Sequence, residues 1–162
     1  IPPASTFGYG IYQEVIAADF GVTLTPENFY DYAVHFPFGV VSALSVLVRI
    51  PVAFEPDGSI VCVGEVPTHS MLRLLRAPTA DASPCVGSIA KTLRARPARD
   101  WLLAFYCAGR RMHFGAAASS ELAQLKNETG IPSVIGALSL GEISTNPDFG
   151  IPEFHNAALV CL

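Results

Sequence analysis

Residues 101–107 read Trp-Leu-Leu-Ala-Phe-Tyr-Cys, a continuous apolar run that decides the fold class of this chain. A run of this length, without Gly or Pro inside it, is typical of a central β-strand buried on both faces. Helical patterns flank it at residues 83–93 and at residues 116–129, the second of which stops before Gly130. The run therefore predicts a sheet strand with a helix before it and a helix after it.

Further elements extend outward from this centre in both directions. Residues 9–20 place apolar side chains at helical spacing, and Thr25-Pro26-Glu27 has the residue types of a helix start. We expect the other strands at residues 44–54, 60–63, 71–75, 134–140 and 157–162. The first three of these are joined by short turns, which favour an antiparallel meander. The order ααβββαβαββ is that of an α+β protein, with a mainly antiparallel sheet of about six strands and helices packed on it.

Length and composition predict one domain with a surface that another protein covers. The chain has 162 residues, of which 51% are hydrophobic and 15% charged, where a typical soluble domain has roughly 25% charged residues. A net charge of −4 does not attract nucleic acid. No stretch approaches the roughly 18 apolar residues that a membrane span needs. The shortage of charge therefore favours a protein interface, with a partner protein or within a homo-oligomer.

The four cysteines and the start of the chain bear on its location. The cysteines form no C-x-x-C pair, and their spacing suits no zinc module. No signal peptide is visible, so we expect a cytoplasmic protein with reduced thiols. The chain begins at Ile1 without Met, which suggests a piece of a longer protein.

Polar side chains stand at the ends of the apolar runs in the last third of the chain. They are Cys107, Arg110, Glu142, His155 and Asn156. Soluble domains often keep their sites at such positions, on the loops that follow buried elements. We therefore expect a ligand-binding site here, in which Arg110 meets an anionic group and Glu142 a cationic group. His155 and Asn156 would add hydrogen bonds.

Other interpretations of these residues remain open. Cys107, His155 and Glu142 have the residue types of a nucleophilic triad, but no nucleophile elbow or oxyanion loop accompanies them. A cation two to four residues from Cys107 could also lower the pKa of its thiol. His155 could serve as a haem ligand, although we expect no cofactor. We expect no enzymatic activity.

Arginines outside this group are further candidates. Arg49 lies inside the strand expected at residues 44–54, and an inward-facing Arg needs a carboxylate or a ligand. Arg94, Arg96 and Arg99, with Arg111, form either a solvated positive face or an anion site. The remaining histidines are isolated near turns or a helix start and carry no expected site role.

Several short stretches together resemble the C-terminal FIST domain of F-box and intracellular signal transduction proteins. They follow the family's order and span nearly the whole chain: Leu24-Thr25-Pro26-Glu27-Asn28-Phe29, Phe36-Pro37-Phe38-Gly39, Val48-Arg49-Ile50-Pro51, Asp57-Gly58-Ser59, Cys107-Ala108-Gly109-Arg110, Gly136, Gly141-Glu142-Ile143 and Phe154-His155-Asn156. The chain departs from the family at Ala137-Leu138-Ser139, where aromatic residues are more common, and at Ala157-Ala158, where Thr is common.

The resemblance implies a sensory input domain of signalling proteins, found in bacteria and in eukaryotic F-box adaptors, that binds small ligands such as amino acids. It implies a preceding N-terminal FIST domain, whose docking would cover the apolar face. Some relatives are linked to haem and nitric oxide sensing. The expected function is therefore sensing of a small polar ligand, and the alternatives are a protein-interaction adaptor, a haem sensor and a Cys107-dependent enzyme.

Overall fold

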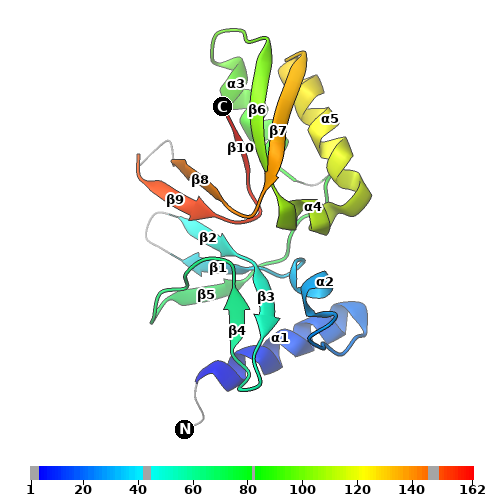
Figure 1. The fold of residues 1–162 in the computed structure, drawn as a ribbon, viewed down its shortest axis with the longest axis vertical. Helices are drawn as coiled ribbons and strands as arrows, with labels where there is room; N and C mark the ends of the chain where they lie inside the picture. Colours follow the sequence, from blue (N-terminus) through cyan, green and yellow to red (C-terminus); the bar gives the residue numbers. More distant parts are fainter. Residues whose placement is uncertain (1–3, 42–44, 82, 146–149) are drawn as a thin grey trace. The chain divides into compact units, whose positions relative to one another are not determined.

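The computed structural model describes residues 4–41, 45–81, 83–145 and 150–162. The chain divides into two compact units, unit 1 (Ile1–Ala77) and unit 2 (Pro78–Leu162), which are described in turn (Figure 1). Both units combine helices with small sheets whose strands pair mostly antiparallel. The α+β class is therefore confirmed.

Unit 1 contains a long helix, a short helix and two small antiparallel sheets. Its elements are α1 (Ala4–Phe20), α2 (Phe29–Ala33), β1 (Phe38–Val41), β2 (Val46–Arg49), β3 (Pro51–Phe54), β4 (Ile60–Cys62) and β5 (Met71–Leu74). One sheet has the strand order β2-β1-β5, and β3 and β4 form a hairpin. Gly58 stands in the turn of this hairpin with a φ of 82°, a left-handed conformation that favours glycine.

The core of unit 1 forms where α1 packs on α2 and the segment after it. Tyr12 and Ile16 lie one helical turn apart on α1 and are buried with Phe29, Ala33 and Phe36. The Tyr12 hydroxyl donates to the backbone carbonyls of Ala33 and Phe36, each at 3.0 Å. The helical spacing of apolar residues on α1 thus buries one face of this helix. The Tyr12 hydroxyl on that face holds the end of α2 in place.

Unit 1 departs from the sequence prediction at three places. The second helix begins at Phe29, because Thr25 and Asn28 exchange hydrogen bonds in a turn. The strand expected at residues 44–54 is split at Pro51, which has no N–H to continue a ladder; its first residue, Leu44, lies outside the described part. Of the predicted antiparallel meander, the pairing of residues 51–54 with residues 60–62 is confirmed. The pairing with the third strand is wrong, because β5 pairs with β1, which was not predicted.

Unit 2 is built on a three-stranded sheet. Its elements are α3 (Cys85–Arg94), β6 (Trp101–Cys107), α4 (Ala108–Phe114), the 3-10 helix η1 (Gly115–Ala117), α5 (Ala118–Thr129), β7 (Ser133–Ser139), β8 (Glu142–Thr145), β9 (Pro152–His155) and β10 (Leu159–Cys161). The strand order is β10-β6-β7, with β6 parallel to β7 and antiparallel to β10. β8 and β9 form a separate antiparallel hairpin.

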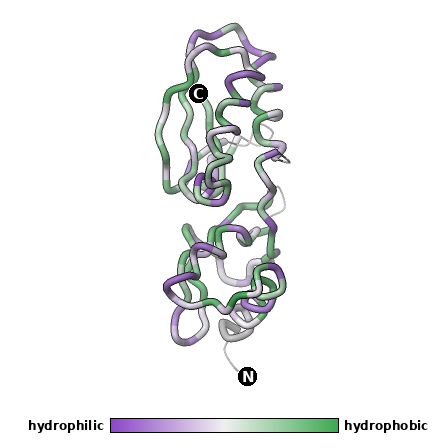
Figure 2. Tube along the Cα trace, turned by 90° about the vertical axis from the view of Figure 1, so that its right-hand side faces the viewer, coloured by the Kyte–Doolittle hydropathy of each residue, from purple (hydrophilic) through white to green (hydrophobic). Residues whose placement is uncertain are grey.

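One face of this sheet is covered by helices and the other carries exposed apolar side chains. Leu102, Ala104 and Tyr106 alternate along β6 and pack in the core with α3 and α5. Trp101 and Phe105, which alternate with them, are exposed. The prediction that this strand is buried on both faces is therefore wrong. Figure 2 shows the hydrophobic character of these strands and a hydrophilic stretch of chain at the top of the view.

The unpredicted elements of unit 2 are short. α4 follows β6 without a break and ends at Gly115, whose φ is 55°. β8 and β9 have four residues each, in a stretch of the chain where no strand was expected. Asn146, Pro147 and Asp148, which stand between these strands in the sequence, lie outside the described residues.

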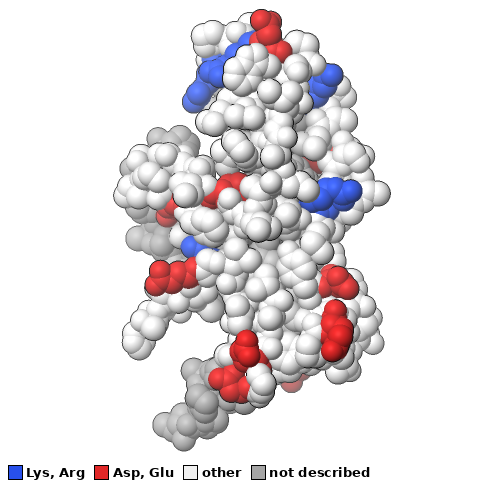
Figure 3. All heavy atoms as spheres, in the orientation of Figure 1, with Lys and Arg blue, Asp and Glu red and all other residues white. Residues whose placement is uncertain are grey.

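Charged side chains are sparse on the face of the molecule shown in Figure 3, most of which is uncharged. Across residues 4–41, 45–81, 83–145 and 150–162, no helix is long and apolar enough to cross a membrane.

We expect replacement of Tyr12 by Phe to lower the free energy of unfolding by about 1–2 kcal/mol, because two buried carbonyls lose their donor. Urea unfolding followed by circular dichroism measures the change. Tyr32→Phe is the matched control, since Tyr32 is half-buried and packs through its ring against Phe20. Equal losses in the two variants would contradict the tethering role of the Tyr12 hydroxyl.

Candidate functional site

The carboxyl ends of two parallel strands bring polar groups together in unit 2. Cys107 ends β6 and stands opposite Ser139, which ends β7. Because the two strands are parallel, their ends meet at one edge of the sheet, the edge where α/β sheets commonly bind ligands. Three residues after Ser139 the chain enters β8 at Glu142.

Glu142 is a buried carboxylate with only one oxygen satisfied. Glu142 is only 3% exposed to solvent. Oε1 accepts a hydrogen bond from the Ser139 hydroxyl, whereas Oε2 is buried and has no hydrogen-bond partner among the described residues. The approach to this position is tight, because a Cβ on Gly141 would overlap the ring of Phe154.

Burial raises the pKa of the Glu142 carboxyl, because the charged form loses its hydration. The hydrogen bond from the Ser139 hydroxyl opposes this effect in part, as do the Ala158 backbone and the Cys107 thiol. Ala158 and Cys107 lie near the carboxyl, but neither makes a hydrogen bond of ordinary geometry to Oε2. A carboxylate in this state can hold a proton or accept a hydrogen bond from a cationic group. Glu142 therefore has the chemistry of a binding residue for a donor.

The segment before β10 closes the site on its other side. The Ala157 amide donates to Sγ of Cys107 at 3.2 Å, and the Cys107 amide donates to the Ala158 carbonyl at 3.1 Å. Ala157 has a φ of 57°, an uncommon conformation for a residue with a Cβ. Asn156 is buried, and its Nδ2 donates to the His155 carbonyl at 3.3 Å.

His155 stands directly opposite Glu142 in the β8–β9 hairpin. Directly opposed residues of an antiparallel pair place their side chains on the same face. His155 is half-buried. The structure therefore brings His155 and Glu142, which are 13 positions apart in the sequence, to one face of a hairpin that was not predicted.

Arg110 is held by protein groups. It lies on α4, and its Nε and Nη2 donate to the two carboxylate oxygens of Glu121 on α5. Nη2 also donates to Oγ of Ser83 at 2.8 Å, and Nη1 donates to the Ala157 carbonyl at 3.1 Å. Its guanidinium carbon stands 4.8 Å from the centre of the Phe114 ring. These contacts occupy the donors that the sequence prediction offered to an anionic ligand.

Glu121 and Tyr106 complete this buried group, and sequence reasoning missed both. The Tyr106 hydroxyl donates to Glu121 Oε2 at 2.5 Å. Burial, and then the bond to Glu121, raise the pKa of Tyr106. The available signal was Arg110 itself, since an Arg among apolar residues needs a carboxylate, and Glu121 is the acidic residue in the first turn of α5. Ser139 was also missed, because it reads as an ordinary strand residue.

Arg49 belongs to unit 1 and has backbone partners there. It is buried, its Nε donates to the Glu65 carbonyl, and its Nη1 donates to the Val48 carbonyl, both at 2.9 Å. These partners are backbone oxygens, whereas the sequence analysis named a carboxylate or a ligand as the partner of an inward-facing Arg. A ligand contact at Arg49 stays a prediction.

Two further arginines and His113 contact backbone carbonyls of unit 2. Arg94 donates to the Glu128 carbonyl at 2.8 Å, Arg111 donates to the Gly115 carbonyl, and Nε2 of His113 lies 2.6 Å from the Pro78 carbonyl. Within the described part of the chain, no three His, Cys, Asp or Glu side chains gather closely enough to hold a metal ion.

Comparison with known families identifies one match. The sequence pattern of the FIST C domain matches residues 9–145. This range includes Cys107, Arg110 and Glu142 and ends before His155 and Asn156. No curated protein and no solved structure matches the chain.

We expect Glu121→Ala to lower the free energy of unfolding by about 3–5 kcal/mol, because it leaves the buried Arg110 without its counter-charge. Thermal and urea unfolding measure the loss. Asp19→Ala is the control: Asp19 pairs with Arg76, whose side chain is 67% exposed, and exposed pairs contribute little to stability. A loss of similar size in the control would contradict the distinction.

We also expect Glu142→Gln to gain stability relative to the unchanged chain as the pH rises. The folded chain raises the pKa of Glu142 above an unfolded value of about 4.3, so the folded state favours the proton. The resulting stabilisation is present below pH about 4 and is lost as the pH rises through the folded pKa. Gln has no proton to lose. A melting-temperature difference that stays constant from about pH 4 to pH 8 would contradict the raised pKa.

Proposed function

The chain belongs to the FIST C domain family, a family of signalling-associated sensory domains, and we propose that it senses a small polar ligand whose protonated amine binds Glu142. The ligand class is that of amines and amino acids. The site comprises Glu142 and Ser139, with Asn156 and His155 at its border.

The observation that carries this proposal is the buried Oε2 of Glu142, which has no partner among the described residues. Leaving a buried acceptor unsatisfied costs about 1–3 kcal/mol, and more for a charged group. An ammonium group would supply the missing donor together with a counter-charge. Binding of a cationic donor would therefore remove the free-energy cost of the unsatisfied Oε2, and this would favour the bound state.

Arg110 has a positioning role in this proposal. Its guanidinium holds the carboxylate of Glu121 and the carbonyl of Ala157, and the Ala157 amide in turn donates to Cys107. Arg110 thus fixes the segment that borders Glu142 while its own donors face protein acceptors. The anionic end of an amino-acid ligand, where one binds, would have to find other donors such as Asn156.

We propose binding without turnover. Cys107 is 1% exposed, and its sulfur already accepts a hydrogen bond from the Ala157 amide. A thiol in that position is poorly placed to attack a substrate, because a nucleophile must reach the reacting atom. This environment supports a structural role for Cys107 at the wall of the site. The output of the sensor would pass to a neighbouring signalling domain or protein.

The test is ligand-induced thermal stabilisation measured with a panel of small primary amines and amino acids, each amine paired with its isosteric alcohol. At a free concentration of 100 times Kd, a binding amine stabilises the fold by about 2.7 kcal/mol. We expect the alcohol to give no stabilisation. We expect Glu142→Gln to lose the response to the amine, because the amide carries no charge.

Glu153→Gln provides the matched control, since Glu153 lies on the same hairpin and is half-buried. This variant should keep the full response. If the amine stabilises the Glu142→Gln variant as strongly as it stabilises the unchanged protein, Glu142 is excluded as the binding group.

A further inference from the structure

Unit 1 contains a pocket that the sensory proposal for unit 2 does not use. It has a volume of about 430 Å³ and lies between α1, β1, β4 and β5. Side chains that line it include Ile11, Tyr12, Phe38, Ile60, Leu72 and Leu74. The pocket is open to solvent on one side, and small-molecule sites occupy roughly 300–1,000 Å³. The size is therefore that of a ligand site.

Among the described residues, no charged side chain lines this pocket. The Tyr12 hydroxyl donates to the carbonyls of Ala33 and Phe36. The Ser59 amide donates a hydrogen bond to Oδ1 of Asp57, and the Ser59 carbonyl accepts one from the Glu55 amide. These polar groups at the pocket thus have partners in the protein, and the remaining lining is mostly apolar.

Cys62 supplies a weak polar group in the wall. Burial raises the pKa of its thiol to about 11, so the thiol is neutral near pH 7. The charge of Arg49 reaches this thiol and opposes the shift. Arg49 itself does not line the pocket, and it donates to the carbonyls of Glu65 and Val48. The pocket therefore offers neither a counter-ion nor a free strong donor to a charged ligand.

From these features we infer that unit 1 binds a small uncharged apolar molecule in the pocket between α1 and strands β1, β4 and β5. The ligand buries its hydrophobic body against both sheets and the helix. The wall side chains of β5 support this reading, because Leu72 is 44% exposed and Leu74 37% exposed although both are apolar. An occupant would cover them and gain the free energy of burying apolar surface.

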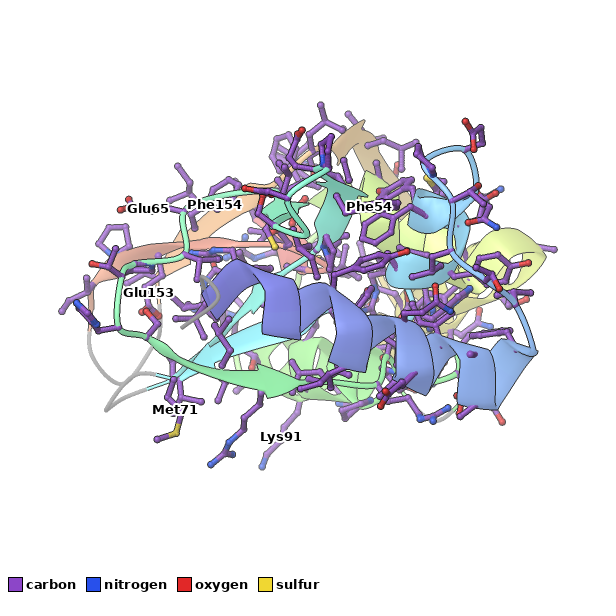
Figure 4. All side chains as sticks on the ribbon, turned by 90° about the horizontal axis from the view of Figure 1, so that it is seen from below. Phe54, Glu65, Met71, Lys91, Glu153 and Phe154 are labelled. Carbon is purple, nitrogen blue, oxygen red and sulfur yellow. The ribbon has the colours of Figure 1, made fainter. Side chains whose placement is uncertain are left out.

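The test uses the uncharged dye Nile red as the probe on the full chain. We expect saturable one-to-one binding with a blue-shifted emission. Leu72→Arg should weaken binding by at least about tenfold, because a charge enters an apolar wall. Met71→Arg is the matched control: Met71 is the neighbouring residue on β5, it is 65% exposed, and its side chain points away from α1 (Figure 4).

The position of the dye is checked by cysteine protection. Cys62 and Cys161 are both half-buried, and burial raises the pKa of each thiol to about 11. Only Cys62 lines the pocket. Peptide mapping after treatment with N-ethylmaleimide should show that Nile red slows modification of Cys62 and leaves Cys161 unchanged. Equal protection of both cysteines, or equal weakening by Leu72→Arg and Met71→Arg, would overturn the assignment.

The charge preference is tested by competition. Decanol should displace Nile red, and decanoate at the same free concentration should not, because the pocket has no counter-ion for a carboxylate. Stronger displacement by decanoate would overturn the claim that the ligand is uncharged. Glu142→Gln should leave dye binding unchanged, so failure at this pocket and failure at the amine site of unit 2 give different results. An absence of saturable binding by the unchanged chain would also overturn the inference.

Discussion

Unit 2 depends on the buried ion pair between Arg110 and Glu121. Burying two charges costs several kcal/mol per ion unless their geometry is good and further hydrogen bonds satisfy them. Here both carboxylate oxygens accept from the guanidinium, and Tyr106, Ser83 and Ala157 provide the remaining contacts. The pair therefore ties together α4, α5, β6, Ser83 near the start of α3 and the segment before β10, five parts of the chain that no single strand ladder joins.

This arrangement explains how Glu142 can stay unsatisfied. The Ala157 carbonyl is fixed by Arg110, and its neighbouring amides and carbonyls are fixed by Cys107. With the segment held in this way, the Ala158 backbone and the Cys107 thiol stay close to the Glu142 carboxyl without completing a hydrogen bond of ordinary geometry to Oε2. A rigid surrounding structure is the general condition under which a functional site retains an unfavourable local arrangement. The ion pair thus preserves the unfilled acceptor.

Sequence reasoning located the α+β class, the central strand and the strand-end polar residues, because apolar runs and helix stops are local signals. It did not anticipate the pairing of Arg110 with Glu121, because Glu121 lies on another helix and the two residues meet only in the folded unit. The β8–β9 hairpin was missed because four-residue strands with alternating polar residues resemble loop. Trp101 and Phe105 looked buried because composition reports hydrophobicity and cannot report which face of a sheet lacks a partner.

The two sites differ in the way that occupancy can change the protein. The pocket of unit 1 is apolar, so a ligand there adds buried surface to a core that already has its hydrogen bonds. In unit 2 the unbound state holds a desolvated carboxylate at the start of β8, and a ligand can shift an equilibrium only by its differential affinity for two states. A cationic donor has such a difference, because it favours the arrangement in which Glu142 is charged and buried. Under the proposed function, the β8–β9 hairpin, which carries Glu142 and His155 on facing strands, is the element whose order would be most directly coupled to ligand binding.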